Sequence, residues 1–145
     1  MWITQDGKIY FGDCRPGDRG ATAAEALQYY QGLTWGGIKA ERDRRKVGGV
    51  KVGLKWFHSD DGSRIQQMGL VMMGTSIPAD LQWKTMDGSF ITMTQAVAQS
   101  VFAAAAANDQ AIFAVAEGHR VAMEASADPA VYDYSTGWPK IYGEV

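Results

Sequence analysis

Apolar residues recur along this chain with two different periods, which separate predicted strands from predicted helices. Residues 50–57 alternate between apolar and other side chains, the two-residue period of a half-buried strand. Segments 81–86 and 89–93 also alternate, and Asp87-Gly88 between them favours a tight hairpin turn. We therefore expect one small antiparallel sheet built from strands near 50–57, 81–86 and 89–93.

The longest helical pattern covers residues 94–125 and is dominated by alanine. Residues 103–107 are an unbroken alanine run, with Phe102 before it and Phe113 beyond it. A helix of about 30 residues spans roughly 45 Å, more than one face of a core this small requires. Its apolar residues form more than one stripe, so we expect part of the helix to contact other chains, including further copies of itself.

Asn108 allows two interpretations of this helix. In heptads counted from residue 97, one seam position holds Val101, Asn108, Val115 and Ala122, and the other holds mostly small residues. A single Asn in such a seam can fix the register and the oligomeric state of paired helices. Alternatively, Asn108-Asp109 marks a kink or a break between two shorter helices.

The N-terminal part predicts a hairpin followed by interrupted helices. Asp6-Gly7 lies between two short apolar segments within residues 1–20, and Thr22 with Glu25 forms a capping box. We expect a helix from residue 22 to about 32, an interruption at Gly36-Gly37 and a second helix over 38–46.

Residues 32–49 are thus the expected hinge between two units. The first is an N-terminal hairpin-and-helix appendage over residues 1–36, and the second is a main α+β domain over 37–145.

A shorter helix is predicted over residues 63–73, after a turn at 58–63 and before a C-cap glycine at position 74. Ile65, Met68 and Met72 share one side of it. The chain has seven methionines, among them Met68, Met72, Met73, Met86 and Met93. Methionine fills irregular core gaps or serves adaptable binding surfaces, and core filling is the favoured interpretation for them. The aromatic tail over 128–145 is expected to lie as an irregular strip on a neighbouring molecule.

Composition narrows the functional classes. The chain has 145 residues, which favours one domain with at most a small appendage, and its 46% hydrophobic residues suffice for a core. The net charge of −2 argues against nucleic acid as a partner. The basic stretch 39–46 is interpreted as a solvated helix face, with a phosphate-binding patch as the alternative.

Cysteine usage and hydropathy indicate where the protein is made. Cys14 is the single cysteine and cannot form an internal disulfide, which fits a reducing compartment. No apolar run reaches the ~18 residues that a membrane span needs. The first ten residues lack a signal-peptide pattern. We therefore expect folding in the cytoplasm and no membrane partner.

No grouping of residues indicates catalysis, a metal or a cofactor. His58 lies beside Ser59, Asp60 and Asp61, but adjacent residues in one turn cannot align a nucleophile, a base and an orienting acid. These residues fit a helix cap. His119 has no metal-ligand spacing to His58 or to nearby acids and is expected at a solvated or seam position. We expect a protein that is not an enzyme.

Large aromatic residues are the best candidates for contact with a partner, because such side chains dominate interface energetics. Trp56 and Phe57 are adjacent in a strand, so they cannot both face one core. One of them is expected to be exposed or covered by another chain. The candidate interaction residues are Trp56, Phe57, Trp83, Phe90, Phe102, Asn108, Phe113 and Trp138.

Residues 38–138 resemble a domain of unknown function found in tailed phages and prophages, in tail fibre assembly-type proteins. The resemblance follows the order IKAERDRRK, VKVGLKWFHSDDGSRIQQMG, LQWKTMDGSFITMT, the alanine-rich helix and YDYSTGWP. Its most specific pieces are WFHSDDGSR and QWKTMDGSFITMT. The segment GKIYFGDCRPGDRGATAAEA also resembles the leader of such proteins.

The resemblance implies an α+β protein that acts through protein–protein contacts in a tail fibre system. The expected role is an assembly chaperone in the host cytoplasm, with a phage tail fibre or baseplate protein as partner. The alternative is a structural tail fibre or baseplate component retained in the virion. Two further options do not come from the resemblance: a small glycan-active enzyme, which would need two carboxylates paired in a cleft, and an unrelated oligomeric binding module.

Overall fold

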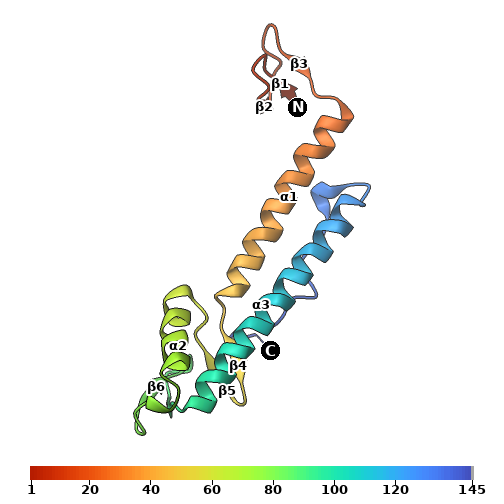
Figure 1. Ribbon diagram of the computed structural model, residues 1–145. Helices are drawn as coiled ribbons and strands as arrows, with labels where there is room; N and C mark the ends of the chain where they lie inside the picture. Colours follow the sequence, from red (N-terminus) through yellow and green to blue (C-terminus); the bar gives the residue numbers. More distant parts are fainter. Residues whose placement is uncertain (145) are drawn as a thin grey trace.

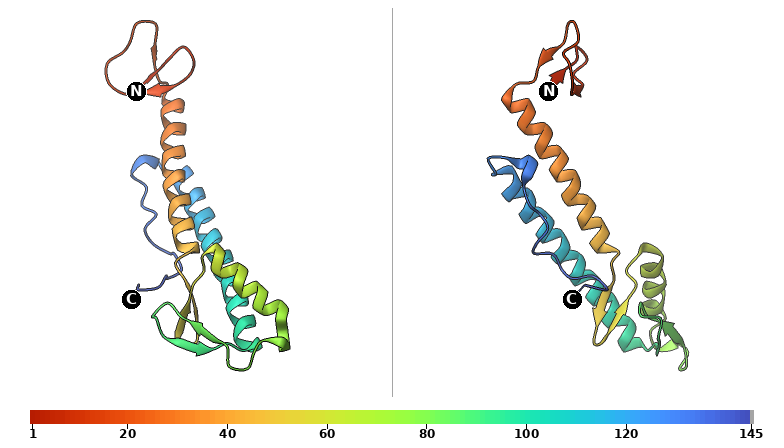
Figure 2. Two further views of the ribbon diagram at one scale, coloured as in Figure 1. Left: turned by 90° about the vertical axis from the view of Figure 1, so that its left-hand side faces the viewer. Right: turned by 180° about the vertical axis from the view of Figure 1, so that it is seen from behind.

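Two long helices lie side by side and give the molecule its elongated shape (Figure 1). The computed structural model describes residues 1–144. Helix α1 spans Ala23–Lys46 and helix α3 spans Gln95–Glu124. A small strand lobe sits at one end, beyond α3, while α2 and two hairpins pack near α3 at the other end (Figure 2). The expected α+β class is confirmed.

The N-terminal lobe contains the predicted hairpin and one further strand. Strand β1 (Trp2–Ile3) pairs antiparallel with β2 (Ile9–Tyr10) on one side and with β3 (Arg19–Gly20) on the other. Among these strands only Ile3 is buried. The lobe therefore has little core of its own, and it contacts α1 through the Arg19–Glu25 ion pair and through Phe11, whose ring lies 5.7 Å from that of Tyr29.

Helix α1 begins at the predicted cap and continues without a break. Thr22 accepts a hydrogen bond from the Glu25 amide, and the Glu25 carboxylate accepts one from the Thr22 amide. The predicted interruption at Gly36-Gly37 is wrong, because α1 is helical throughout its 24 residues. The expected unit boundary after residue 36 falls inside this helix.

The segment 50–57 is a hairpin, and the prediction of one strand there is wrong. Strand β4 (Val50–Val52) pairs with β5 (Lys55–Phe57), and Gly53 takes a positive φ of 60° in the turn. The alternating pattern alone could not show that the chain reverses at this glycine, because both arms continue the same period.

The second predicted hairpin is confirmed, with β6 (Gln82–Lys84) paired to β7 (Phe90–Thr92). It does not join the first hairpin in one sheet, as had been expected; each forms its own two-stranded sheet. One backbone hydrogen bond, from the Met86 amide to the Trp56 carbonyl at 2.9 Å, links the two.

Helix α2 spans Asp61–Met73 and begins two residues before its predicted start, with Asp60 as its N-cap. The predicted C-cap at Gly74 is confirmed, with φ 57° there, and a short 3₁₀ turn η1 (Gly74–Ser76) follows. Core filling is the wrong interpretation for Met68, Met72 and Met73, which are exposed, and it is confirmed for Met93, which is buried.

Helix α3 is one continuous helix of 30 residues, so the predicted long helix is confirmed and the alternative of a break at Asn108 is excluded. Thr94 is its N-cap and accepts a hydrogen bond from the Val97 amide. Val101 of the proposed seam is buried in the protein's own core, and Asn108 is half-buried. That part of the seam therefore faces the same chain.

Two hydrophobic clusters lie along α3. The first gathers Val101 and Ala105 of α3 with β4, β5 and α2, and its largest fully buried side chain is Phe57. The second holds Ile38 of α1 against Ile112 of α3. Helix α3 thus supplies residues to both clusters and ties the two ends of the molecule together.

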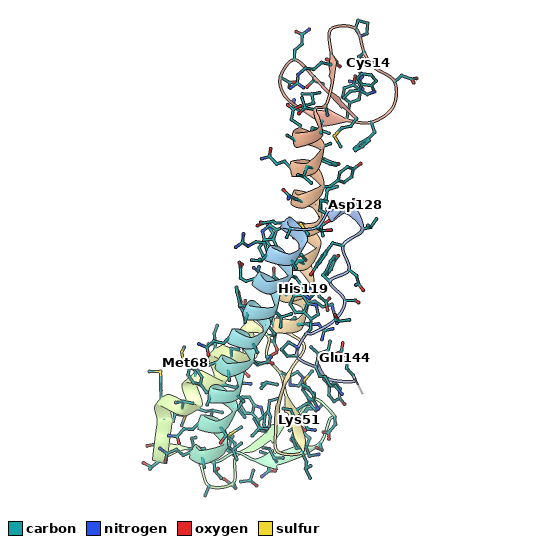
Figure 3. All side chains as sticks on the ribbon, turned by 90° about the vertical axis from the view of Figure 1, so that its right-hand side faces the viewer. Cys14, Lys51, Met68, His119, Asp128 and Glu144 are labelled. Atoms are coloured by element: carbon teal, nitrogen blue, oxygen red, sulfur yellow. The ribbon has the colours of Figure 1, made fainter. Side chains whose placement is uncertain are left out.

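The aromatic tail packs on its own chain, so the expectation that it lies on a neighbour is wrong. After η2 (Pro129–Val131) it runs back along α1 and α3 (Figure 3). Trp138 is buried there against Ile38 and Ile112, and its indole N–H donates to the Tyr134 carbonyl at 2.7 Å. Val145, the last residue of the predicted tail, lies outside the described residues.

The tail also contacts His119, which was expected at a solvated or seam position, and Arg45, which lies in the stretch that was expected to be a solvated face. His119 contacts the Tyr132 hydroxyl and the Thr136 carbonyl, both at 2.9 Å. Arg45, within the basic stretch, is buried and donates to the Pro139 carbonyl at 2.7 Å and to Glu144 at 3.0 Å. The stretch 39–46 is therefore not simply a solvated face, because Arg45 anchors the tail.

Candidate protein-binding surface

The outer side of α3 is covered by no other element of the described chain. One stripe along it holds only alanine, serine or glycine at successive turns, and every member is exposed: Ala96, Ser100, Ala103, Ala107, Ala111, Ala114, Gly118 and Ala122. A helix on the surface of a globular protein normally turns charged and polar residues toward water. This stripe is therefore unusual for a surface that stays in water.

Charge is nearly absent along most of α3. From Gln95 to residue 116, Asp109 is the only charged residue. Its carboxylate binds the Arg64 guanidinium through two contacts of 2.7 and 2.9 Å. Arg64 also donates to the Lys46 carbonyl at 3.0 Å and to the Ser59 carbonyl. The single charge on this part of α3 is thus neutralised by α2.

An apolar groove of about 290 Å³ lies between α2 and α3. Ile65 and Met68 of α2 form one wall, Phe102 of α3 forms the other, and Ala105 and Ala106 line it between them. The groove ends at the Arg64–Asp109 ion pair. Phe102 is 45% exposed. Apolar walls with a neutral end suit an apolar side chain from a partner better than a charged ligand.

The outer face of α2 continues this apolar surface. Ile65, Met68 and Met72 are 66%, 46% and 80% exposed. Gly69 lies among them, and a Cβ built at Gly69 would meet no atom within 4 Å. From Ile65 to Met73, α2 carries no charged residue. We call this outer face together with the groove the α2–α3 surface.

The predicted aromatic contact residues fall into three groups. Phe102, Phe113 and Phe90 are exposed, and Arg42 stacks over the Phe113 ring at 4.8 Å. Trp56 and Trp83 are half-buried, Trp56 with its ring edge against Tyr142 at 6.2 Å between centroids. Phe57 and Trp138 are buried in the interior.

Trp56 is thus partly covered by Tyr142 of the protein's own tail. Asn108 is half-buried, and its buried Nδ2 has no hydrogen-bond partner within residues 1–144. It lies beside the protein's own core and does not belong to the exposed stripe.

Sequence reasoning missed Ile65, Met68 and Met72 as surface residues. It grouped them on one side of the helix but assigned that side to the core. The signal that could have found them is the absence of any charge from Ile65 to Met73. A surface helix normally has a charged face toward solvent, and this part of the helix has none.

The residues that might have suggested catalysis have structural roles. The Ser59 hydroxyl donates to the Lys46 carbonyl and accepts from the Gly49 amide, both at 2.8 Å. The His58 carbonyl accepts from Gln67 at 2.8 Å. Asp60 caps α2, and its hydrogen bonds with Ser63 lower the pKa of its carboxyl group. These contacts confirm the helix-cap interpretation for Asp60.

The acids elsewhere likewise serve turns and helix ends. The Lys55 ammonium at 2.7 Å, with Ser89 and Thr85, holds the pKa of the Asp87 carboxyl group well below its usual range in the β6–β7 turn. Within residues 1–144, no group of three or more histidine, cysteine, aspartate or glutamate side chains is placed to hold a metal ion.

Comparison with known proteins gives one family match. The model of a family described as a domain of unknown function (DUF4376) matches residues 30–136. No curated protein and no solved structure matches the chain. Among the described helices, none combines the length and the apolar character needed to cross a membrane.

Proposed function

We propose that this chain, which belongs to the DUF4376 family, is a non-enzymatic component of the tail fibre system of a tailed bacteriophage or prophage. It acts through protein–protein contacts as a tail fibre assembly chaperone in the host cytoplasm. The proposal takes its biological setting from the resemblance in the segments WFHSDDGSR and QWKTMDGSFITMT. It takes its physical basis from the uncovered surface of α3.

The observation that carries the proposal is the exposed, nearly uncharged outer side of α3. Alanine and glycine at every turn allow another backbone to approach closely, and they lose little side-chain entropy when covered. Phe113 lies at the side of α3 where Arg42 of α1 stacks over its ring, and it is still 44% exposed, so it adds a larger apolar area at the edge of this outer side. A fibre segment with an apolar face therefore fits this side of the molecule.

A structural role in the virion is the alternative, because the same surface would serve a permanent contact with a fibre or baseplate protein. The two roles differ in whether the protein leaves the fibre after assembly. Both roles predict a direct complex with the fibre or baseplate protein. The chaperone role predicts that the protein is absent from finished virions, and the structural role predicts that it is present in them.

Co-expression with the tail fibre protein of the same phage or prophage tests the proposal. If the fibre becomes soluble only together with this protein, and the protein is absent from washed virions, it is a chaperone. Retention in washed virions indicates the structural role instead. Fibre that behaves identically with and without the protein, with no complex and no incorporation, overturns the tail fibre proposal.

Two variants locate the contact. Ala107→Arg places a charge in the middle of the outer stripe, and Phe113→Ser removes the partly exposed aromatic ring over which Arg42 stacks. Both are expected to abolish fibre solubilisation while leaving the fold intact. Leu54→Ser is the matched control, because Leu54 is 92% exposed in the β4–β5 turn and lies outside this surface.

A further inference from the structure

We propose that Arg45 forms a carboxylate-binding site, and that residues 139–144 of the tail close this site with the carboxylate of Glu144. We call these residues the C-terminal clasp. The clasp opens while α1 and α3 stay packed, and the open site accepts a carboxylate from a partner peptide. The site lies at the end of α1, away from the outer side of α3, so it goes beyond the tail fibre proposal and does not depend on it.

The Arg45 guanidinium has the geometry of a carboxylate receptor. Its two terminal nitrogens donate to the two carboxylate oxygens of Glu144 at 3.0 and 3.2 Å, the paired arrangement that makes arginine–carboxylate contacts strong and specific. Glu41 on the same helix also accepts a hydrogen bond from Arg45, and the Trp138 ring lies 5.9 Å from the guanidinium. The Arg45 side chain is 10% exposed. A charge this deeply buried is normally paired, and Glu144 supplies that pairing from the tail.

The balance of charge at the site identifies the class of ligand. Arg44 and Arg45 both bind the single carboxylate of Glu41, and Arg44 also lies 3.8 Å from Glu144. When Glu144 leaves, two guanidinium groups share one carboxylate, so the open site has an excess positive charge. Hydrogen bonds from Arg45 are the main reason that the pKa of the Glu144 carboxyl group lies below its ordinary value. The group that fits the open site is therefore an ionised carboxylate.

The clasp also fits the site by its shape. The Glu144 amide donates to the Ile141 carbonyl at 3.1 Å, and Gly143 between them has a positive φ of 88°, so residues 141–144 form a tight turn. The Tyr142 amide donates to the Gly48 carbonyl at 2.9 Å. A Cβ added at Gly48 would overlap the Ile141 side chain. Glycine at position 48 therefore leaves the space that the turn occupies beside Arg45.

Local opening is expected because the clasp contributes nothing to the hydrophobic clusters. No residue from 139 to 144 is buried, whereas Trp138, just before the clasp, is buried between α1 and α3. Apolar packing thus holds the tail as far as Trp138, and mainly polar contacts with Arg45 and Gly48 hold the clasp. Segments with few buried apolar contacts open at a lower free energy than the core does. Opening therefore stops at Trp138 and leaves the two long helices in place.

Amide hydrogen exchange of the full chain, followed by NMR, tests the local opening. Glu144→Gln is expected to speed exchange of the Tyr142 amide by about 10-fold or more, because a hydrogen bond between charged groups is lost. The Ile112 amide of α3 should keep its wild-type rate. Glu117→Gln, which neutralises an exposed carboxylate on α3, is the control and should change neither rate. Gly48→Ala displaces the turn sterically and should release the Tyr142 amide in the same way.

A peptide test checks the class of ligand. The receptor is the full chain with Glu144→Gln and Ile141→Ser, whose own clasp no longer fills the site. The probe is a peptide of residues 139–144, blocked at both ends so that Glu144 is its only carboxylate. This peptide should shift the side-chain NMR signals of Arg45. The same peptide with Glu144→Gln should bind at least about 10-fold more weakly, and the wild-type chain, with its site filled, should bind neither peptide.

Each result decides one part of the proposal. Unchanged exchange at Tyr142 in Glu144→Gln overturns the clasp, and equal acceleration at Tyr142 and Ile112 overturns its local opening. Equal binding of the two peptides, or no binding of either at millimolar concentration, overturns the carboxylate site. Fibre solubilisation in the co-expression experiment is decided on the outer side of α3, so failure of the clasp leaves the tail fibre proposal standing.

Discussion

The hydroxyl group of Tyr134 lies directly over Gly37, so that a Cβ added at Gly37 would overlap the tyrosine ring and its oxygen. The glycine pair that looks like a helix break in the sequence is thus a site of close packing between α1 and the returning tail. Gly36, its neighbour, faces open space, with no atom within 4 Å of a built Cβ.

This difference predicts opposite effects for two neighbouring substitutions. Gly36→Ala should stabilise the protein by up to about 1 kcal/mol, because alanine is favoured over glycine in a helix and nothing obstructs it. Gly37→Ala should destabilise it by about 1–3 kcal/mol, because the tail must move. The free energy of unfolding in urea, measured for both variants and for the wild type, tests this prediction. Equal effects at the two positions would contradict the packing described here.

The Arg64–Asp109 pair is predicted to matter more than ordinary surface pairs. Arg64 joins α3 to the ends of α1 and β5 through Asp109 and the carbonyls of Lys46 and Ser59. Asp109→Asn should cost about 1.5–3 kcal/mol, the range for hydrogen bonds to charged groups. The control is Glu117→Gln at the exposed Arg120 pair, which should stay below about 1 kcal/mol. The free energy of unfolding in urea distinguishes the two variants. A larger loss of stability in Glu117→Gln than in Asp109→Asn would contradict the prediction.

The junction between the N-terminal lobe and α1 should be sensitive to acid. Hydrogen bonds from Arg19 and Thr22 lower the pKa of the Glu25 carboxyl group from 4.5 to about 2. Because the folded pKa is depressed, the stabilisation is complete above pH 4.5 and is lost as the pH falls toward 2. Carboxyl titration by NMR should show a midpoint near 2 for Glu25. In Arg19→Gln the titration midpoint of Glu25 should move up toward 4.5. An unchanged midpoint would show that Arg19 is not the main cause of the lowered pKa.

His119 is predicted to be held in one tautomer. Its Nε2 lies 2.9 Å from the Thr136 carbonyl, which can only accept, so neutral His119 carries its proton on Nε2. Nδ1 then accepts from the Tyr132 hydroxyl at 2.9 Å. The ¹⁵N chemical shifts of the ring should report the Nε2–H form, and Tyr132→Phe should cost about 1 kcal/mol in unfolding free energy. A dominant Nδ1–H form would contradict the contact with Thr136.

Local signals predicted much of the fold. The cap at Thr22 and the turns at Asp6-Gly7 and Asp87-Gly88 depend only on residues close in sequence. The errors came from distant contacts. Nothing near Gly37 shows that Tyr134 will cover it, and nothing within residues 50–57 distinguishes one strand from two arms that reverse at Gly53.

The candidate surface was harder to predict for a related reason. Periodicity shows which residues share a helix face, as with Ile65, Met68 and Met72, but it does not show which face the rest of the chain covers. In α2 the covered face holds Gln67 and Leu70, which are buried, and the methionines lie on the opposite side. The absence of charged residues from Ile65 to Met73 is the one sequence signal that both faces of α2 are apolar enough to be buried.

The claim that another polypeptide covers the outer side of α3 is tested most directly by Ala107→Arg in the fibre co-expression experiment. Ala107 is exposed in the middle of the stripe, so an arginine there disturbs a partner and leaves the protein's own packing intact. We predict soluble fibre with the wild type and with Leu54→Ser, and insoluble fibre with Ala107→Arg at an unchanged Tm. Full solubilisation of the fibre by Ala107→Arg would contradict the claim.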